Sequence, residues 1–316
     1  MTSMRILLYD PEEGHTEWIR LLAAELPSAV MQPWYENDSL PADYLIVRKP
    51  PANVLARRPG VKAVFYIGAG IDWLLRLRSE QHLPVLDDAR LVRLDDAGMG
   101  EQMVDYVVHA VLHFYRRFHD YDAQQHCRKW TALSILPKSL FPIGIMGAGV
   151  LGKQIATRLH EFGFPVRTWS SAVKRDVRYQ SFAGLDSLAT FADKLKIVVN
   201  VLPLTPMTRG ILNRDLFRAL DDRAYLVNVA RGAHLNESDL LIAIREGKID
   251  AAQLDVVGTE PLPSHHPFWN EPKIRLTPHI AADIDRTKAA KQIASKIALI
   301  ENNQPINGVV DWTRGY

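Results

Sequence analysis

The stretch Ile143-Gly144-Ile145-Met146-Gly147-Ala148-Gly149-Val150-Leu151-Gly152 decides the fold of this chain. Its first four residues predict a short buried strand, and the segment 150–162 that follows predicts a helix. Between them, the spacing GxGxxG in this context is typical of a dinucleotide-binding turn. Gly147 permits the tight turn, Gly149 leaves bare backbone for a pyrophosphate, and Gly152 allows the helix to pack closely on the strand.

The residues after this turn continue the alternation of apolar and amphipathic runs. Six strands separated by helices fit a doubly wound dinucleotide-binding fold. The expected strands are 143–146, 166–169, 197–202, 225–229, 251–255 and 275–276, and the expected helices are 150–162, 185–191, 213–220 and 237–246.

The first hundred residues show a similar alternation, which indicates a second parallel sheet covered by helices. The expected strands there are 4–9, 44–47, 63–67 and 91–94, and the expected helices are 14–25 and 71–78. A break at 95–100 is the first expected crossover between domains. A long helix from 101 to about 126 is expected after it, because apolar residues recur at three- and four-residue steps. A final helix is expected at about 286–301.

Composition narrows the class of protein. The length of 316 residues suggests two domains, since single cores stop growing near about 250–300 residues. With 38 basic and 36 acidic residues and no basic block, nucleic-acid and membrane partners are not expected. The one cysteine, Cys127, suits a reducing compartment, and no apolar run approaches the about 20 residues of a membrane span. We therefore expect a cytoplasmic globular protein, with no signal peptide and no metal site.

Arg231 follows the apolar run 225–229, at the carboxyl end of an expected strand. Ligands of open α/β sheets bind at that end. A guanidinium can hold a carboxylate or a 2-oxo acid through two parallel hydrogen bonds. Position alone is more typical of a surface arginine on a turn.

His279 and Glu260 form a candidate proton-donating pair. A carboxylate within hydrogen-bond reach favours the imidazolium form, which is the form that can donate a proton. Carbonyl reduction needs such a donor, because the new alkoxide must be protonated as the hydride arrives. A purely structural histidine is the alternative, and His265 and His266 are nearby competitors.

Three more segments extend the pattern: 229–232 (VARG), 254–263 (LDVVGTEPLP) and 277–281 (TPHIA). With the glycine loop, they resemble the D-isomer-specific 2-hydroxyacid dehydrogenases over nearly the whole chain. The segments 98–103 (GMGEQM) and 314–316 (RGY) are similar to the glyoxylate/hydroxypyruvate reductase branch of that family.

This resemblance implies a fold and a reaction. The fold class is α/β with two doubly wound parallel-sheet domains: a Rossmann cofactor domain at 99–284, and a discontinuous flavodoxin-like substrate domain at 1–98 and 285–316. The reaction is hydride transfer from NADPH to C2 of a small 2-oxo acid, glyoxylate or hydroxypyruvate, which gives the 2-hydroxy acid. A homodimer built on the cofactor domain is also implied.

The resemblance also assigns residues to the site. The implied catalytic residues are Arg231, Glu260 and His279. The implied cofactor-binding residues are Gly147, Gly149, Val150, Leu151, Gly152, Ser170, Ser171, Lys174, Leu202, Pro203, Thr208, Ala230, Arg231, Asp255 and His279. The implied substrate-binding residues are Gly68, Ala69, Gly70, Arg231 and His279. A tight strand-to-helix turn is the alternative explanation of the segment 68–70.

The end of the second cofactor-domain strand bears on the choice of dinucleotide. An NAD-selective site places an Asp or Glu there to bond the ribose 2′-hydroxyl, whereas segment 168–175 (TWSSAVKR) contains no acid. Hydroxyls at Ser170 and Ser171 and cations at Lys174 and Arg175 suit a 2′-phosphate. NADP(H) is therefore the expected cofactor and NAD(H) the alternative, with solvated surface charge as the other explanation of the two cations.

Other functions share these motifs. Another D-2-hydroxyacid dehydrogenase is the nearest alternative, although a formate dehydrogenase of this superfamily would be expected to carry Gln in place of Glu260. A dinucleotide-sensing, corepressor-like binding protein is the alternative from a different class, and rapid NADPH oxidation with glyoxylate would distinguish an enzyme from a sensor. The set of Arg231, Glu260 and His279 argues against an inactive structural homologue.

Overall fold

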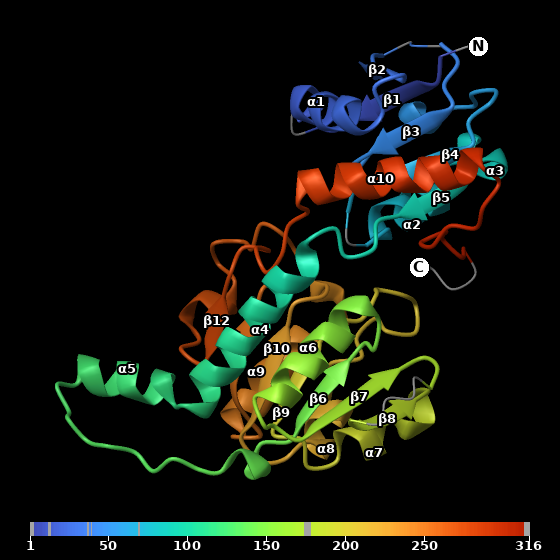
Figure 1. The fold of residues 1–316 in the computed structure, drawn as a ribbon. Coiled ribbons are helices and arrows are strands. Elements are labelled where there is room, and N and C mark those ends of the chain that lie inside the picture. Colours follow the sequence, from blue (N-terminus) through green and yellow to red (C-terminus); the bar gives the residue numbers. More distant parts are fainter. Residues whose placement is uncertain are drawn as a thin grey trace. The chain divides into compact units, whose positions relative to one another are not determined.

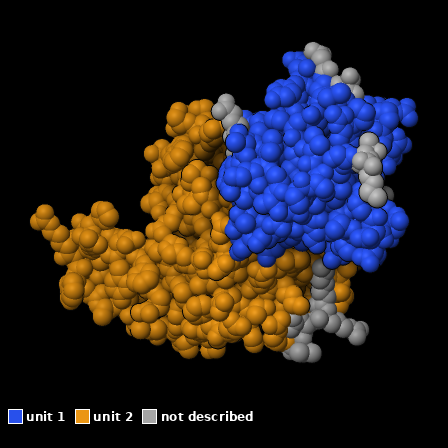
Figure 2. Space-filling view, turned by 45° about the horizontal axis from the view of Figure 1, so that its top comes forward, with its two compact units in different colours: residues 1–99, 284–316 blue, residues 100–283 orange. Residues whose placement is uncertain are grey.

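The computed structural model describes residues 3–11, 14–36, 38, 40–68, 70–173 and 178–312. The chain divides into two compact units, shown in different colours in Figure 2. Unit 1 comprises Met1–Met99 and Ile284–Tyr316, and unit 2 comprises Gly100–Asp283. Each unit is built on one sheet in which all paired strands are parallel (Figure 1).

Unit 1 has a sheet of five described strands in the order β2-β1-β3-β4-β5, which is the flavodoxin-like arrangement. The strands are β1 Arg5–Tyr9, β2 Val30–Pro33, β3 Tyr44–Val47, β4 Ala63–Tyr66 and β5 Arg90–Arg93. The helices are α1 His15–Glu25, η1 Ala52–Leu55, α2 Asp72–Glu80, α3 Val85–Asp88 and α10 Arg286–Glu301.

Successive residues of the unit 1 strands point to opposite faces of the sheet and feed two separate cores. On one face, Ile46 and Phe65 pack with Trp18 of α1 and Ile293 of α10. The other core contains alternate strand residues together with Leu74 of α2. The C-terminal helix α10 is thus part of the unit formed by the first hundred residues.

Unit 2 has a sheet of seven described strands in the order β12-β11-β10-β9-β6-β7-β8. Counted from β6, this is the Rossmann order with one extra strand at the edge. The strands are β6 Ile143–Met146, β7 Val166–Ser170, β8 Gln180–Ala183, β9 Ile197–Asn200, β10 Ala224–Asn228, β11 Ile249–Leu254 and β12 Ile274–Leu276. The helices are α4 Met99–Tyr115, α5 Phe118–His126, η2 Lys138–Leu140, α6 Val150–Glu161, η3 Leu185–Ser187, α7 Leu188–Ala192, α8 Arg214–Ala219, η4 Gly232–His234, α9 Glu237–Arg245 and η5 Pro267–Asn270.

The unit 2 sheet is covered on both faces. Val107 of α4 and Ile155 of α6 pack on one face, and α7, α8 and α9 contribute to the core on the other. The expected fold class, with two doubly wound parallel-sheet domains, is confirmed.

The single long helix expected at 101 to about 126 is wrong. Arg117 separates α4 from α5 and adopts a left-handed conformation with φ of 60°, which cannot continue a right-handed helix. The Arg117 Nε donates to Asp120 Oδ2, in the first turn of α5, at 2.6 Å. Every residue of α5 is at least partly exposed, so the apolar stripe that predicted one helix ends with α4.

Strands β2 and β8 were not expected, and each lies at an edge of its sheet. Their sequences, VMQP and QSFA, are only partly buried. Central parallel strands show continuous apolar runs because both of their faces are covered. Edge strands lack that pattern, which explains why the sequence did not predict these two.

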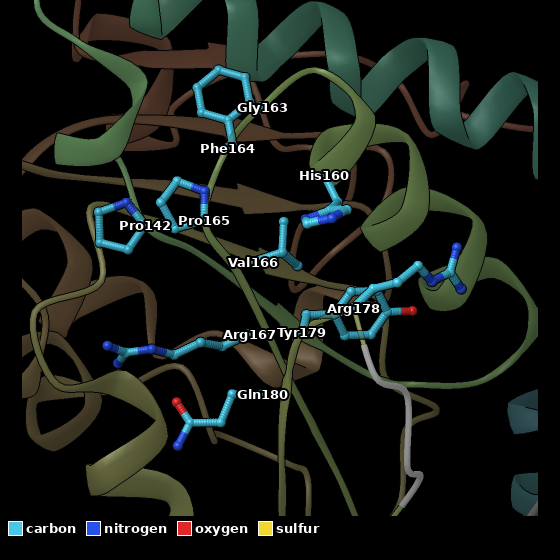
Figure 3. Close-up of a pocket in the computed structure, with 10 residues that line it drawn as sticks. All are labelled: Pro142, His160, Gly163, Phe164, Pro165, Val166, Arg167, Arg178, Tyr179 and Gln180. Carbon is cyan, nitrogen blue, oxygen red and sulfur yellow. The ribbon is translucent and has the colours of Figure 1, made fainter.

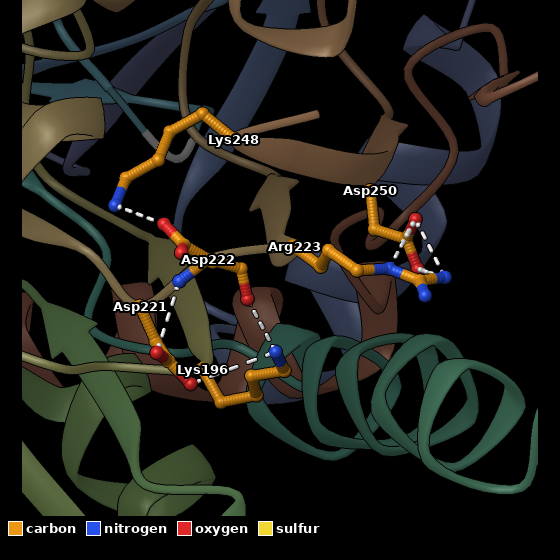
Figure 4. Close-up of polar contacts among 6 residues, drawn as sticks. All are labelled: Lys196, Asp221, Asp222, Arg223, Lys248 and Asp250. Atoms are coloured by element: carbon orange, nitrogen blue, oxygen red, sulfur yellow. Dashed lines mark hydrogen bonds and ion pairs between the residues drawn. The ribbon is translucent and has the colours of Figure 1, made fainter. Parts of the chain in front are cut away.

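Ion pairs line the amino ends of three neighbouring unit 2 strands (Figure 4). Lys248 Nζ lies 2.9 Å from Asp222 Oδ1, and Arg223 Nη2 lies 3.0 Å from Asp250 Oδ2. The hydrogen bond and the charge of Lys248 lower the pKa of the Asp222 carboxyl. The functional motifs of unit 2 follow the opposite, carboxyl ends of the strands.

Candidate active site

The glycine loop joins β6 to α6 with the geometry that its spacing predicts. Gly147 has φ of 112°, a conformation suited to glycine. A Cβ on Gly152 would lie 1.7 Å from the Gly147 carbonyl oxygen, so the close approach of helix and turn excludes a side chain there. At Gly149, the N-cap of α6, a Cβ would meet nothing within 4 Å. Open backbone before a helix N-terminus suits a pyrophosphate.

The two residues after Gly149 begin α6. Val150 is 51% exposed, and Leu151 is half-buried. Their position in the first turn fits the predicted role in binding the dinucleotide, which stays a prediction.

Ser170 ends β7, the neighbour of β6, and its Oγ donates to the Ala172 carbonyl at 2.7 Å. Ser170 is buried and Ser171 is exposed. The described end of this strand therefore presents hydroxyls and no carboxylate. Lys174, also predicted to bind here, lies outside the described residues.

The loop after β9 is closed by its own hydrogen bonds. The Thr208 hydroxyl donates to the Pro203 carbonyl at 2.8 Å and accepts from the Thr205 N–H at 2.8 Å. Leu202 is 6% exposed, and its N–H donates to the Asn200 side chain at 3.3 Å. Thr208 thus shapes the loop, and direct contact of these residues with a cofactor stays a prediction.

Arg231 lies just beyond the carboxyl end of β10, as its sequence position predicted. Its Nη1 donates to the Ala230 carbonyl at 2.6 Å. The Asn228 side chain donates to the Arg231 carbonyl at 3.1 Å and accepts from the Ala230 N–H at 3.3 Å. The backbone that carries the guanidinium is therefore held by a buried amide.

Sequence reasoning missed a buried polar network beneath these loops. Asn200 Nδ2 lies 3.0 Å from Asn228 Oδ1 and 3.0 Å from His234 Nδ1. All three side chains are fully buried. His234 Nε2 lies 3.3 Å from the Pro203 carbonyl, so the network joins the loops after β9 and β10. An Asn at the end of each of two consecutive apolar strands was the signal available in the sequence.

His279 and Glu260 are hydrogen-bonded, with His279 Nδ1 2.8 Å from Glu260 Oε2. The two side chains are 46% and 40% exposed. Burial acts to raise the pKa of Glu260. The hydrogen bond and charge of His279, the Val257 N–H and the charge of Arg231 together lower that pKa below the ordinary value of 4.5. The Glu260 carboxylate therefore stays ionised beside the imidazole ring down to a lower pH than an ordinary glutamate.

The two competing histidines differ from His279. His266 Nε2 lies 3.2 Å from Glu237 Oε2, and its Nδ1 accepts from the Phe268 N–H at 3.3 Å. His266 therefore caps the short helix η5. His265 is an exposed residue in the same loop.

Asp255 follows β11 and is 2% exposed. Its carboxylate accepts the N–H groups of Ile280 and Ala281, each at 2.8 Å. The side chain therefore supports the segment that carries His279. Its implied role in binding the cofactor stays a prediction.

In unit 1, Gly68 and Gly70 lie between β4 and α2. A Cβ on Gly68 would lie 2.6 Å from the Tyr66 ring, so the turn is tightly packed. Ala69 lies outside the described residues. Carboxylate binding by this turn stays a prediction.

The pocket in Figure 3 has a volume of about 400 Å³ and lies elsewhere in unit 2. It is lined by the amino ends of β7 and β8 and by the end of α6, including His160, Arg167 and Arg178. Arg167 Nη1 donates to the Asp193 carbonyl at 2.8 Å. The pocket therefore lies at the amino ends of the strands, whereas the glycine loop follows the carboxyl end of β6.

Within the described ranges, no group of three or more His, Cys, Asp or Glu side chains is arranged to hold a metal ion.

Residues 108–281 match the family model described as D-isomer specific 2-hydroxyacid dehydrogenase, NAD binding domain. The chain belongs to this family. Glyoxylate/hydroxypyruvate reductase A of Serratia proteamaculans is 45% identical over 313 residues, which cover 99% of this chain and 100% of that protein. The enzyme of the same name from Escherichia fergusonii is 44% identical over the same length and coverage.

Solved structures of the 2-hydroxyacid dehydrogenase family match both units of the chain. The Xanthobacter autotrophicus Py2 protein in complex with NADPH and MES has a TM-score of 0.93 and 33% identity, and the match covers 100% of both chains. The NADPH-dependent glyoxylate/hydroxypyruvate reductase of Sinorhizobium meliloti, in complex with NADP and sulfate, has a TM-score of 0.88 and 31% identity. That match covers 99% of this chain and 100% of the other. The predicted family is thereby confirmed.

Replacing Glu260 with Gln should change the pH dependence of turnover. Protonation of the Glu260 carboxyl removes its negative charge beside His279, so kcat of the wild type should fall at low pH, as the pH drops through the lowered pKa of Glu260. A Gln side chain does not titrate, so Glu260→Gln should have a lower kcat than the wild type at neutral pH and should lack this fall at low pH.

The measurement is kcat as a function of pH at saturating substrates. Glu237→Gln is the matched control, because it neutralises the other Glu–His pair of this region and should leave the profile unchanged. An unchanged profile in Glu260→Gln would contradict the assignment.

Proposed function

We propose that this protein reduces glyoxylate or hydroxypyruvate at C2 to the 2-hydroxy acid, with NADPH as the hydride donor. The observation that carries the proposal is the 2.8 Å hydrogen bond between His279 and Glu260, in the unit that also carries the glycine loop. The full-length relatives named glyoxylate/hydroxypyruvate reductase A support the choice of substrate. Unit 2 is the proposed dinucleotide-binding domain and unit 1 the proposed substrate domain.

Each of the three polar residues has a separate task in the proposed reaction. Bound NADPH supplies the hydride. Arg231 binds the substrate carboxylate, since its guanidinium offers two parallel donors. His279 uses Nδ1 for Glu260, which leaves the Nε2 proton for the substrate oxygen. Glu260 stabilises the imidazolium before the proton leaves, which is the task of a general-acid partner.

Replacing His279 with Gln tests this reaction most directly. Loss of a general acid should reduce kcat for glyoxylate by about 10²–10⁴-fold, with NADPH affinity little changed. Arg231→Lys keeps the charge but loses the planar fork, so kcat/KM for glyoxylate should also fall steeply. His265→Gln, an exposed neighbour, is the matched control and should keep wild-type kinetics. Near-wild-type turnover in His279→Gln would contradict the proposed mechanism. A wild-type protein that oxidises no NADPH with either acid would reject the proposed function.

Cofactor preference can be tested at the end of β7. One charge-assisted hydrogen bond to a 2′-phosphate contributes about 1.5–3 kcal/mol, so the wild type should prefer NADPH by about 10- to 100-fold. Ser170→Asp repels the phosphate and offers the ribose hydroxyl an acceptor, which should move selectivity toward NADH. Ser238→Asp adds the same charge on an exposed position of α9 and should leave the preference unchanged. The measurement is kcat/KM for both cofactors at low and high salt, and equal wild-type values would reject the NADPH preference.

The protein is also proposed to form a homodimer through unit 2. The support for this proposal is that the segment from α5 to η2 exposes several large apolar side chains, of a kind that marks interaction sites where they gather on a surface. They are Phe118 at 46%, Trp130 at 101%, Ile135 at 73%, Leu136 at 46% and Leu140 at 56% exposure. Trp130→Glu should shift the protein toward monomer in sedimentation equilibrium, and Tyr35→Glu, an exposed aromatic of unit 1, should not. A monomeric wild type would reject this proposal.

The location is proposed to be cytoplasmic, where NADPH is available and where a protein with one cysteine needs no disulfide. No helix in the described part of the chain is long and apolar enough to cross a lipid bilayer.

A further inference from the structure

The backbone of His279 is held in a conformation that needs support. Its φ is 57°, in the left-handed region that non-glycine residues rarely adopt. The Asp255 carbonyl accepts the His279 N–H at 2.9 Å. The Asp255 carboxylate accepts the next two N–H groups through Oδ1 and Oδ2. One buried residue therefore anchors three consecutive amides around the imidazole.

A chain of side-chain hydrogen bonds leads from helix α4 to that carboxylate. Gln253 Nε2 lies 2.6 Å from the Tyr106 hydroxyl. The Tyr106 hydroxyl lies 2.5 Å from Thr277 Oγ1, which lies 2.6 Å from Asp255 Oδ1. These hydrogen bonds thus link α4, β11 and the segment after β12.

The directions of these bonds follow from the chemistry of their ends. An amide N–H₂ can only donate, and an ionised carboxylate can only accept. Thr277 must therefore donate to Asp255, so Tyr106 donates to Thr277 and accepts from Gln253. Each hydroxyl in the chain gives one proton and receives one, which leaves no competing arrangement.

Burial strengthens this chain of side-chain hydrogen bonds. Gln253 is 3% exposed, Asp255 is 2% exposed and Ala281 is 3% exposed. Burial also raises the pKa of Tyr106, which keeps its hydroxyl protonated as a donor. Hydrogen bonds are electrostatically stronger at low local dielectric, and bonds in series polarise one another.

We propose that Tyr106 and Thr277 are positioning residues for His279: they orient the Asp255 carboxylate, which in turn fixes the backbone that presents the imidazole. The inference rests on the proposed role of His279 as proton donor. Neither Tyr106 nor Thr277 is assigned contact with substrate or cofactor. Their effect on turnover passes through the geometry of the segment 277–281.

Three variants test the chain. Thr277→Val removes the hydroxyl and keeps the branched shape, Tyr106→Phe removes only the phenol oxygen, and Thr277→Ser keeps the hydroxyl. The first two should lower kcat for glyoxylate by about 10-fold, because small misplacements of a catalytic group have effects of this order or larger. KM for NADPH should stay within about twofold, because neither of the hydroxyls removed is assigned a contact with the cofactor. Thr277→Ser should retain most of the wild-type kcat.

A second measurement does not depend on activity. Hydrogen–deuterium exchange of the amides of Ile280 and Ala281 should be faster in Thr277→Val and Tyr106→Phe than in the wild type, because these N–H groups donate to the carboxylate that the chain orients. Tyr44→Phe is the matched control. It removes a phenol that donates to Glu301 at 2.6 Å in unit 1, and it should change neither kcat nor this exchange.

The outcomes separate this inference from the proposed function. Wild-type exchange in both Thr277→Val and Tyr106→Phe would overturn the inference, and so would a Thr277→Ser variant as impaired as Thr277→Val. Faster exchange with wild-type turnover would overturn the link between the chain and the reaction. The His279→Gln variant decides the proton-donor role independently, since the exchange measurement reports on the chain even if that role fails.

Discussion

The parallel register of β9, β10 and β11 is the constraint on which the candidate site depends. Asn228 pairs with Asn200 on one side and with Leu254 on the other, so the three strands end at the same level. All strands of the sheet are parallel, so a crossover connection returns the chain to the same end of the sheet before each new strand. As a result, the segments that carry Arg231 and Asp255 follow the carboxyl ends of adjacent strands, although they are distant in sequence.

The loops at this edge are held mainly by side chains of the strand ends. Asn200, Asn228 and Asp255 are polar residues at the ends of apolar strands, and all three are buried. A buried polar group left without a partner costs about 1–3 kcal/mol. Asn200 and Asn228 instead bond backbone groups of the loops that follow their own strands, and Asp255 bonds backbone groups of the segment after β12. The loops are therefore held by side chains of the sheet that solvent does not reach.

The proposed proton-donating pair has the opposite exposure. His279 and Glu260 are 46% and 40% exposed, whereas the carboxylate that holds the His279 segment is 2% exposed. An exposed imidazole can recover its proton from solvent after each turnover. A buried carboxylate, in contrast, forms hydrogen bonds that are strong and directional. The two carboxylates near His279 thus have different roles: Glu260 is hydrogen-bonded to the imidazole ring, and Asp255 holds the backbone.

The sequence by itself determined the central strands, the glycine turn and the positions of Arg231, Glu260 and His279, because each depends on a local pattern. Buried parallel strands need unbroken apolar runs, and the turn needs glycine where φ is positive or packing is close. The break at Arg117 and the edge strands β2 and β8 were decided by tertiary structure, since partial burial leaves no strong pattern. The chain from Tyr106 to Asp255 was also decided there, because its members come from three elements and meet only when α4 packs on the sheet.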